Sequence, residues 1–326
     1  MVTLEQLKKE FWDGLYVIEY KDEKGKPKKK PEQFYFDKEG IQIAIKRALR
    51  DFTDRTERLK PEYKGQSFSV DRKFNLLCGS DGKEHNEPEN ESFVSEFIEY
   101  FKSKDKFMDK KNFDDWHNKM CEKFLSVFEI FYDHLAYGKA QKIVNMTFKN
   151  VYCLEGEKNS DDYYKHCHMP LDSFTLEWVS RTQNSIKSKS SEYLRKGRIP
   201  SWSKMNYEEQ DAFSTPDGNC YYGYKDIQDA IFTYFDKYVE ENTVTKYLKG
   251  YTPLQAEFFI WKYIQLEIAA ESVYGQLVSF EDLGNTTKKI KNQEFRQKTI
   301  NEKLKYLQDM FKNIEKYNVL EERSEN

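Results

Sequence analysis

Residues 120–154 read MCEKFLSVFEIFYDHLAYGKAQKIVNMTFKNVYCL, and they contain two largely apolar stripes separated by a break at His134–Gly138. Within each stripe the apolar residues recur every three or four positions, which is the spacing of one face of an α-helix. The first stripe contains Met120, Phe124, Val127, Phe128 and Phe131, and the second contains Ala140, Ile143, Val144, Thr147 and Val151. The sequence therefore predicts a helical hairpin over about residues 120–154, with a tight turn between its helices.

The rest of the chain is also predicted to be mostly helical. Apolar spacing indicates helices at residues 3–13, 40–59, 171–181, 224–241, 253–280 and 286–317, and the last two are expected to form a long C-terminal hairpin over 253–317. Two aromatic runs, Gly14–Tyr20 and Gln33–Asp37, flank a lysine-rich loop and predict a β-hairpin, and Ser67–Leu77 alternates like a strand. The predicted fold class is mainly α: a two-lobed helical bundle with a small N-terminal β element.

An acidic stretch, Cys78–Ser92, contains two glycines and a proline and is the best candidate for a linker. It divides the chain into an N-terminal α+β region, residues 1–90, and a helical domain, residues 91–326.

Composition is that of a folded protein from a reducing compartment. Aromatic residues make up 16% of the 326 residues, and their burial offsets the entropy of ordering a chain that is 33% charged. The five cysteines are odd in number and scattered, unlike a disulfide framework. No segment approaches the roughly 18 uninterrupted apolar residues of a membrane span. We therefore expect a cytoplasmic protein with no membrane partner, and we favour a monomer.

Charge is distributed in blocks, although the formal net charge is only −3. The basic blocks are Lys24–Lys30, Lys187–Arg198 and Lys288–Lys298, and the acidic blocks are Asp81–Glu99, Glu155–Asp162 and Glu315–Glu325. The basic blocks fit a face that binds nucleic acid, and they fit ordinary solvated loops and helix faces equally well.

Motifs of several common enzyme classes are missing from the sequence. It contains no Walker loop, no G-x-G-x-x-G and no G-x-S-x-G. Cys153, His166, Cys167 and His168 have side chains that can bind zinc, but zinc ligands usually come as two close pairs and this spacing is irregular. We therefore predict no metal site and no cofactor.

The most chemically suggestive segment runs from His134 to Val179. A turn around Tyr137–Gly138 is expected to leave backbone N–H groups available at the start of the second hairpin helix, where phosphate can bind. Lys139 and Lys142 lie at the beginning of that helix. Further on, Met169–Asp172 reads MPLD, in which the proline ends one segment and the aspartate lies at or just before the N-cap of the next helix.

This order of features resembles the catalytic segment of the helix-hairpin-helix DNA glycosylase superfamily, and most closely its archaeal-type 8-oxoguanine branch. Gly138 matches the hairpin glycine, and the A-x-x-I of the second helix is matched by Ala140 and Ile143. The P-x-D of the family is matched at Pro170–Asp172. The family lysine corresponds either to Lys139, with a shift of one residue, or to Lys142, as in the archaeal-type hairpins. The two lysines remain alternatives.

The segment also departs from the family pattern. Leu135–Gly138 is one residue shorter than the usual hairpin L-P-G-h-G and has one glycine, and the loop that leads to Asp172 is longer by about one helical turn or more. No iron–sulfur cysteine cluster closes the chain, which separates it from the endonuclease III subgroup. A plain buried helix pair, with Asp172 as an ordinary N-cap, explains the same residues without catalysis.

The resemblance implies an enzyme that excises a damaged or modified base from DNA after flipping it out of the helix. Breaking the N-glycosidic bond builds positive charge on the sugar, so Asp172 is expected to stabilise the transition state at C1′. Lys139 or Lys142 is expected to attack as the free amine and form a Schiff base, which permits lyase chemistry. In a bacterium such an enzyme would serve anti-phage defence by attacking hypermodified phage DNA.

The resemblance also implies which side chains meet the DNA. Contacts with DNA are expected from Tyr137, Gly138, Gln141, Lys149, Arg195, Lys196 and Arg198. Flipped bases are held between aromatic or apolar side chains, for which the candidates are His168, Phe174, Trp178 and Trp202. Aromatic residues at helical spacing are also typical of a plain hydrophobic core.

Two further functions remain open at this point. The first is a non-enzymatic DNA- or RNA-binding protein that uses the hairpin and the basic blocks, and the second is a protein-interaction scaffold built on the C-terminal hairpin. A glycosylase requires Asp172 and one hairpin lysine to converge, whereas a binding protein requires only a basic surface and a scaffold requires an exposed apolar seam.

Overall fold

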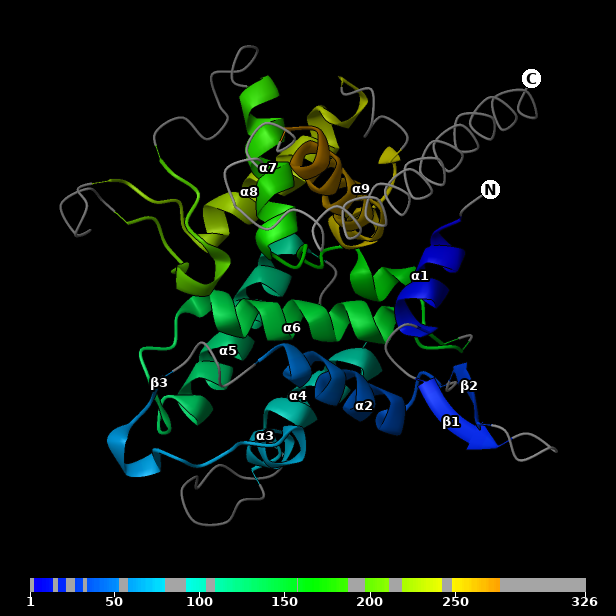
Figure 1. Ribbon diagram of the computed structural model, residues 1–326, viewed down its shortest axis with the longest axis vertical. Helices are drawn as coiled ribbons and strands as arrows, with labels where there is room; N and C mark the ends of the chain where they lie inside the picture. Colours follow the sequence, from blue (N-terminus) through cyan, green and yellow to red (C-terminus); the bar gives the residue numbers. More distant parts are fainter. Residues whose placement is uncertain are drawn as a thin grey trace, which may run out of the picture.

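The computed structural model is mainly α-helical, which confirms the predicted fold class (Figure 1). It describes residues 3–13, 17–21, 27–31, 34–52, 58–79, 92–103, 109–156, 158–186, 197–210, 219–241 and 248–275. The predicted helix at 286–317, and with it the second half of the predicted C-terminal hairpin, lies outside these residues. Among the described helices, none is both long enough and apolar enough to cross a bilayer.

Helix α6 (Tyr137–Tyr152) crosses the middle of the molecule between two groups of helices (Figure 1). On one side lie α2 (Lys38–Ala48), α3 (Val70–Leu77), α4 (Phe93–Lys102) and α5 (Lys110–Phe128). On the other lie α7 (Ser173–Ile186), α8 (Tyr224–Lys237) and α9 (Pro253–Gly275), and α1 (Leu4–Asp13) packs against α9. Short 3₁₀ turns are η1 (Leu49–Asp51), η2 (Pro61–Tyr63), η4 (Asp161–Tyr164), η5 (Trp202–Lys204) and η6 (Val239–Glu241).

Burial of α6 is complete, because all 16 of its residues are buried. A helix that packs on every side is usually apolar all round, whereas this one carries three lysines, Lys139, Lys142 and Lys149. A buried charge is costly unless it is paired or hydrogen-bonded. The partners of these lysines therefore decide how the centre of the molecule is held together.

The hydrophobic core is continuous across the candidate linker near residue 90. One cluster of buried side chains extends from Leu7 to Ile264 and includes Ile41 and Ile45 of α2. Helix α2 packs along α6, and the Asn150 side chain of α6 donates a hydrogen bond to the Ala44 carbonyl of α2 at 3.0 Å. The N-terminal region thus contributes directly to the packing of the central helix.

The N-terminal β-hairpin is present, but its second strand differs from the prediction. Strand β1 (Val17–Lys21) pairs antiparallel with β2 (Pro27–Pro31), the lysine-rich segment, with Val17 opposite Pro31. Residues 34–37 of the aromatic run instead bond to the backbone of Glu155, whose carbonyl accepts from the Phe36 amide at 2.7 Å and whose amide donates to the Phe34 carbonyl at 3.1 Å. The rings of Phe34 and Phe36 pack against the core, whereas Tyr35 is exposed.

Residues 67–77 do not form the predicted strand. Ser69 is the N-cap of α3, and its Oγ accepts from the Arg72 amide at 3.2 Å. Phe74 and Leu77, three positions apart, are both buried, so the helical face decides the structure rather than the alternation.

The connection between α5 and α6 is longer than the predicted tight turn. Helix α5 ends at Phe128, and the eight residues that follow include β4 (Tyr132–Asp133), which pairs with β3 (Arg58–Leu59). His134 then adopts a positive φ of 55°, and α6 begins after the N-cap Ala136. The two helices still pack against each other, but they do not form a compact hairpin turn.

Candidate functional site

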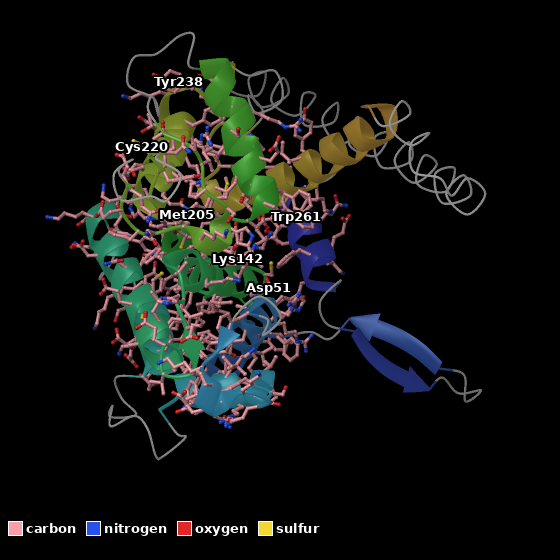
Figure 2. The ribbon with its side chains drawn as sticks, turned by 60° about the vertical axis from the view of Figure 1, so that its left-hand side comes forward. Asp51, Lys142, Met205, Cys220, Tyr238 and Trp261 are labelled. Carbon is pink, nitrogen blue, oxygen red and sulfur yellow. The ribbon has the colours of Figure 1, made fainter. Side chains whose placement is uncertain are left out.

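The structure brings together two of the catalytic candidates. Lys142 Nζ on α6 lies 2.9 Å from Asp172 Oδ2 at the start of α7, although the residues are 30 positions apart in the sequence. The two side chains are 11% and 15% exposed, so the ion pair is shielded but still reaches solvent. Figure 2 labels Lys142 near the centre of the molecule, with Trp261 of α9 above and to the right of it.

Asp172 acts both as a helix N-cap and as an ion-pair partner. Its Oδ1 accepts from the amides of Phe174 and Thr175, each at 3.0 Å, while Oδ2 accepts from Lys142 and from the Trp261 indole at 3.0 Å. Burial by itself raises the pKa of Asp172, but the Lys142 ammonium and the Thr175 amide outweigh it, and the pKa lies below its ordinary value. Asp172 is therefore a carboxylate at neutral pH.

The loop before Asp172 is tied to α6 by Gln141. The Gln141 Nε2 group donates to the carbonyls of Gly138 and Leu171, both at 3.0 Å, and Oε1 accepts from the Leu171 amide at 3.4 Å. Because Leu171 immediately precedes Asp172, these bonds fix the position of the carboxylate relative to Lys142. The sequence analysis expected Gln141 to contact DNA, whereas the structure buries it completely.

A chain of buried hydrogen bonds continues from Gln141 to α5 and α8. Asn145 Nδ2 donates to Gln141 Oε1 at 3.0 Å and to the Tyr224 hydroxyl at 2.8 Å. His168 Nδ1 lies 2.8 Å from the same hydroxyl, and His168 Nε2 lies 2.7 Å from Asp114 Oδ1. A carboxylate only accepts, so Nε2 of a neutral His168 carries the hydrogen, Nδ1 is the acceptor, and Tyr224 donates to it.

Two histidines in this network are held neutral. Burial lowers the pKa of His168, although Asp114 opposes the shift, and burial lowers the pKa of His117 well below its ordinary value. His117 Nε2 lies 2.8 Å from Asn145 Oδ1, and the two imidazole rings have centroids 4.5 Å apart. Asp114 is held as a carboxylate, because bonds from His168 and Lys110 outweigh the effect of burial on its pKa.

We expect the stability of the protein to fall as the pH is lowered from 7 to 5.5. The unfolded chain binds protons at its histidines below about pH 6.5, whereas folded His117 and His168 resist protonation, so each contributes a slope of up to about 1.4 kcal/mol per pH unit. Urea unfolding at several pH values measures this slope. His117→Gln should reduce the slope, and equal slopes in wild type and His117→Gln would contradict the prediction.

The start of α6, where phosphate was expected to bind, is covered by other residues of the protein. The Gly138 amide donates to the Met205 carbonyl at 2.9 Å, and a Cβ at Gly138 would lie 1.6 Å from the Trp202 carbonyl oxygen. Tyr137 is buried and packs against the ring of Tyr207. Residues 202–205 thus cover Gly138, and Tyr137 is buried beside Tyr207, at the position where both were predicted to contact DNA.

The other lysines of α6 have different surroundings. The Lys139 ammonium lies 4.7 Å from the centre of the Trp202 ring, and Lys149 forms a buried ion pair with Glu257 of α9. Lys149 was predicted to contact DNA, and in this structure only 4% of its side chain is exposed. Arg198 remains an exposed candidate, and Arg195 and Lys196 lie outside the described residues.

Of the four predicted base-pocket residues, Phe174 lies beside the ion pair. Its amide donates a hydrogen bond to Asp172 Oδ1. Its half-buried ring meets the Trp261 ring edge to face, with the ring centroids 5.4 Å apart. Trp178 is buried against Tyr234 and Phe235, and His168 is enclosed in the hydrogen-bond network, so the structure places both in the core. Trp202 covers the start of α6.

Trp261 and Glu257 are the polar partners that sequence reasoning missed. Both belong to α9, and Trp261 contacts Asp172 across 89 positions of sequence, a separation at which no local motif signals a contact. Within the described residues, no three or more His, Cys, Asp or Glu side chains are grouped so that they could hold a metal ion. Comparison of the chain with protein-family models, curated proteins and solved structures found no match.

Proposed function

We propose that this protein is a DNA N-glycosylase with lyase activity, in which Lys142 is the nucleophile and Asp172 is the carboxylate that stabilises the reaction at C1′. The observation that supports the proposal is the contact at 2.9 Å between Lys142 Nζ and Asp172 Oδ2. The family resemblance assigns these two residues the two essential roles, and they converge from different elements. The Lys139 ammonium lies over Trp202 instead, which favours Lys142 among the two candidate lysines.

The chemistry requires Lys142 to act as a free amine. Nζ gives one proton to Asp172 Oδ2, its hydrogen-bond partner, and then bonds to C1′ as the bond between C1′ and the base breaks. The departing base keeps the electron pair of that bond and takes the proton from Asp172. The restored carboxylate stabilises the positive charge of the new linkage between C1′ and the lysine nitrogen. That nitrogen then gives a proton to O4′ as the C1′–O4′ bond breaks, and ring opening yields a protonated imine, which borohydride reduces to a stable amine.

The decisive experiment is borohydride trapping on DNA that carries a panel of damaged and modified bases. Wild type is expected to release a base from at least one substrate and to form a covalent adduct on Lys142. Lys142→Gln should abolish trapping, and the matched control Lys139→Gln should retain it. Asp172→Asn should slow base release by about 10²–10⁴-fold, the usual contribution of a positioned proton-transfer group.

Each outcome of this experiment has a distinct meaning. Base release without trapping would overturn the assignment of Lys142 as nucleophile, and full activity in Asp172→Asn would overturn the role of Asp172. Neither release nor trapping across the panel, with salt-dependent DNA binding in the same samples, would indicate a non-enzymatic binding protein. Circular dichroism of each variant verifies that lost activity does not reflect unfolding, since both residues contribute to a buried ion pair.

A further inference from the structure

The two oxygens of the Asp172 carboxylate are held in different ways. Oδ1 is fixed by the backbone amides of Phe174 and Thr175, each at 3.0 Å. Oδ2 has two side-chain donors, Lys142 Nζ at 2.9 Å and the indole Nε1–H of Trp261 at 3.0 Å. During attack on C1′ the Lys142 nitrogen must leave Oδ2, and of these two donors only the indole N–H then remains on that oxygen.

The indole of Trp261 is itself held in place. Its ring meets the ring of Phe174 at an interplanar angle of 80°. The ammonium of Lys149, which belongs to α6, lies 6.0 Å from the centroid of the Trp261 ring. Helix α9, which carries Trp261, packs along α7, which begins next to Asp172 (Figure 2). The direction of the N–H group is therefore set by the packing of three helices rather than by a free side-chain rotation.

We propose that Trp261 is a positioning residue for Asp172. It holds Oδ2 in place while the Lys142 nitrogen leaves that oxygen and bonds to C1′ of the sugar. The inference rests on the proposed function, because it needs Nζ to leave the carboxylate. Once the departing base has taken the proton from Asp172, the shielded carboxylate has lost its ammonium partner, which is unfavourable unless other donors satisfy it. An indole N–H only donates, so its bond to the carboxylate persists while Lys142 changes its protonation state and its partner.

The test compares Trp261→Phe with the matched control Trp178→Phe. Both changes keep an aromatic ring and remove an indole N–H, but Trp178 packs against Tyr234 and Phe235 instead of Asp172. Carbon-13 NMR follows the titration of the Asp172 carboxyl, whose signal is identified by its loss in Asp172→Asn. The midpoint should rise in Trp261→Phe and stay unchanged in Trp178→Phe, because a hydrogen bond to the charged form has been removed.

The reaction provides the second readout. The single-turnover trapping rate of Trp261→Phe should fall about tenfold, the effect of one hydrogen bond to a charged group, and the acid limb of its pH profile should move upward with the Asp172 midpoint. An unchanged midpoint would overturn the proposal whatever the trapping rate. A raised midpoint with an unchanged rate and pH profile would overturn it as well.

Failure of the proposed function is distinguishable from failure of this inference. Absence of both base release and trapping in wild type on every substrate would overturn the glycosylase and the role of Trp261 in its reaction, while the titration alone decides whether Trp261 binds the carboxylate. If Trp261→Phe does not fold, wild type and Asp172→Asn are compared by nitrogen-15 NMR of the five tryptophan indoles. One indole signal should follow the Asp172 titration in wild type only, and if none does the proposal is wrong.

Discussion

Glu257→Gln is expected to lower the free energy of unfolding by about 3–5 kcal/mol, because it leaves the charge of Lys149 buried without a charged partner. The side chains of Lys149 and Glu257 are 4% and 1% exposed, and their ion pair joins α6 to α9. The rings of Phe11 and Phe258 lie 4.2 Å and 4.7 Å from the lysine nitrogen and exclude water from it. A lone ammonium at this position is poorly compensated.

Burial raises the pKa of Glu257, although Lys149 opposes the shift. Because the folded state holds a proton on Glu257 more readily than the unfolded state, this residue contributes most to stability below its unfolded pKa, and its contribution declines as the pH rises through the folded pKa. Above the folded pKa, the pair with Lys149 offsets part of the desolvation of the carboxylate. The pH dependence due to Glu257 begins at the ordinary pKa of a glutamate, and Glu257→Gln should remove it.

Urea unfolding of Glu257→Gln and of a double variant measures the pair. The double variant Lys149→Met with Glu257→Leu should recover most of the stability lost by Glu257→Gln, because replacing a whole buried ion pair with apolar side chains is often neutral. The control is Glu99→Gln, which breaks an exposed pair with Lys102 whose side chains are 58% and 62% exposed. That control should cost less than about 1 kcal/mol. A cost for Glu257→Gln as small as that of Glu99→Gln would contradict the prediction.

Gly138→Ala is expected to destabilise the protein by about 3 kcal/mol, at the upper end of the cost of overpacking, with a further loss of about 1 kcal/mol for a broken hydrogen bond. The added Cβ would lie 1.6 Å from the carbonyl oxygen and 2.8 Å from the carbonyl carbon of Trp202. Both are backbone atoms, so η5 must move away from α6. That movement also disturbs the bond from the Gly138 amide to the Met205 carbonyl.

The matched control for this glycine is Gly65→Ala. Gly65 has a φ of +89° and no atom within 4 Å of an added Cβ, so its substitution introduces backbone strain without a clash. It should cost about 1–2 kcal/mol. Thermal or urea unfolding of the two variants separates close approach from conformational freedom. If Gly138→Ala costs no more than Gly65→Ala, the contact with residues 202–205 is not what requires the glycine.

The close approach of Trp202 to Gly138 concerns the glycine on which the resemblance to glycosylases partly depends. In that family the hairpin glycine allows DNA phosphate to approach the start of a helix. Here the same position is approached by a carbonyl of the protein, so the glycine alone has an explanation without DNA. The pair of Lys142 and Asp172, rather than the hairpin turn, supports the proposed function.

Local signals allowed much of the fold and part of the candidate site to be predicted from the sequence. The periodic apolar residues of α6 and α8 and the N-cap position of Asp172 depend on neighbours within a few positions, so the mainly α fold and the Asp172 helix start were predictable. The same locality made the alternation at 67–77 misleading, because a serine N-cap and burial of one helical face outweighed it.

By itself the sequence determined a mainly helical chain with two candidate lysines and one candidate carboxylate. Only the tertiary structure decided that α6 is buried on every side and that Lys142 pairs with Asp172 while Lys149 pairs with Glu257. It also decided that Trp261 donates a hydrogen bond to the Asp172 carboxylate. The physical reason is that a buried charge needs a partner that is close in space, whatever its position in the sequence. The two side-chain partners of Asp172, Lys142 and Trp261, are 30 and 89 positions away from it. Periodicity and capping carry no information about such distances.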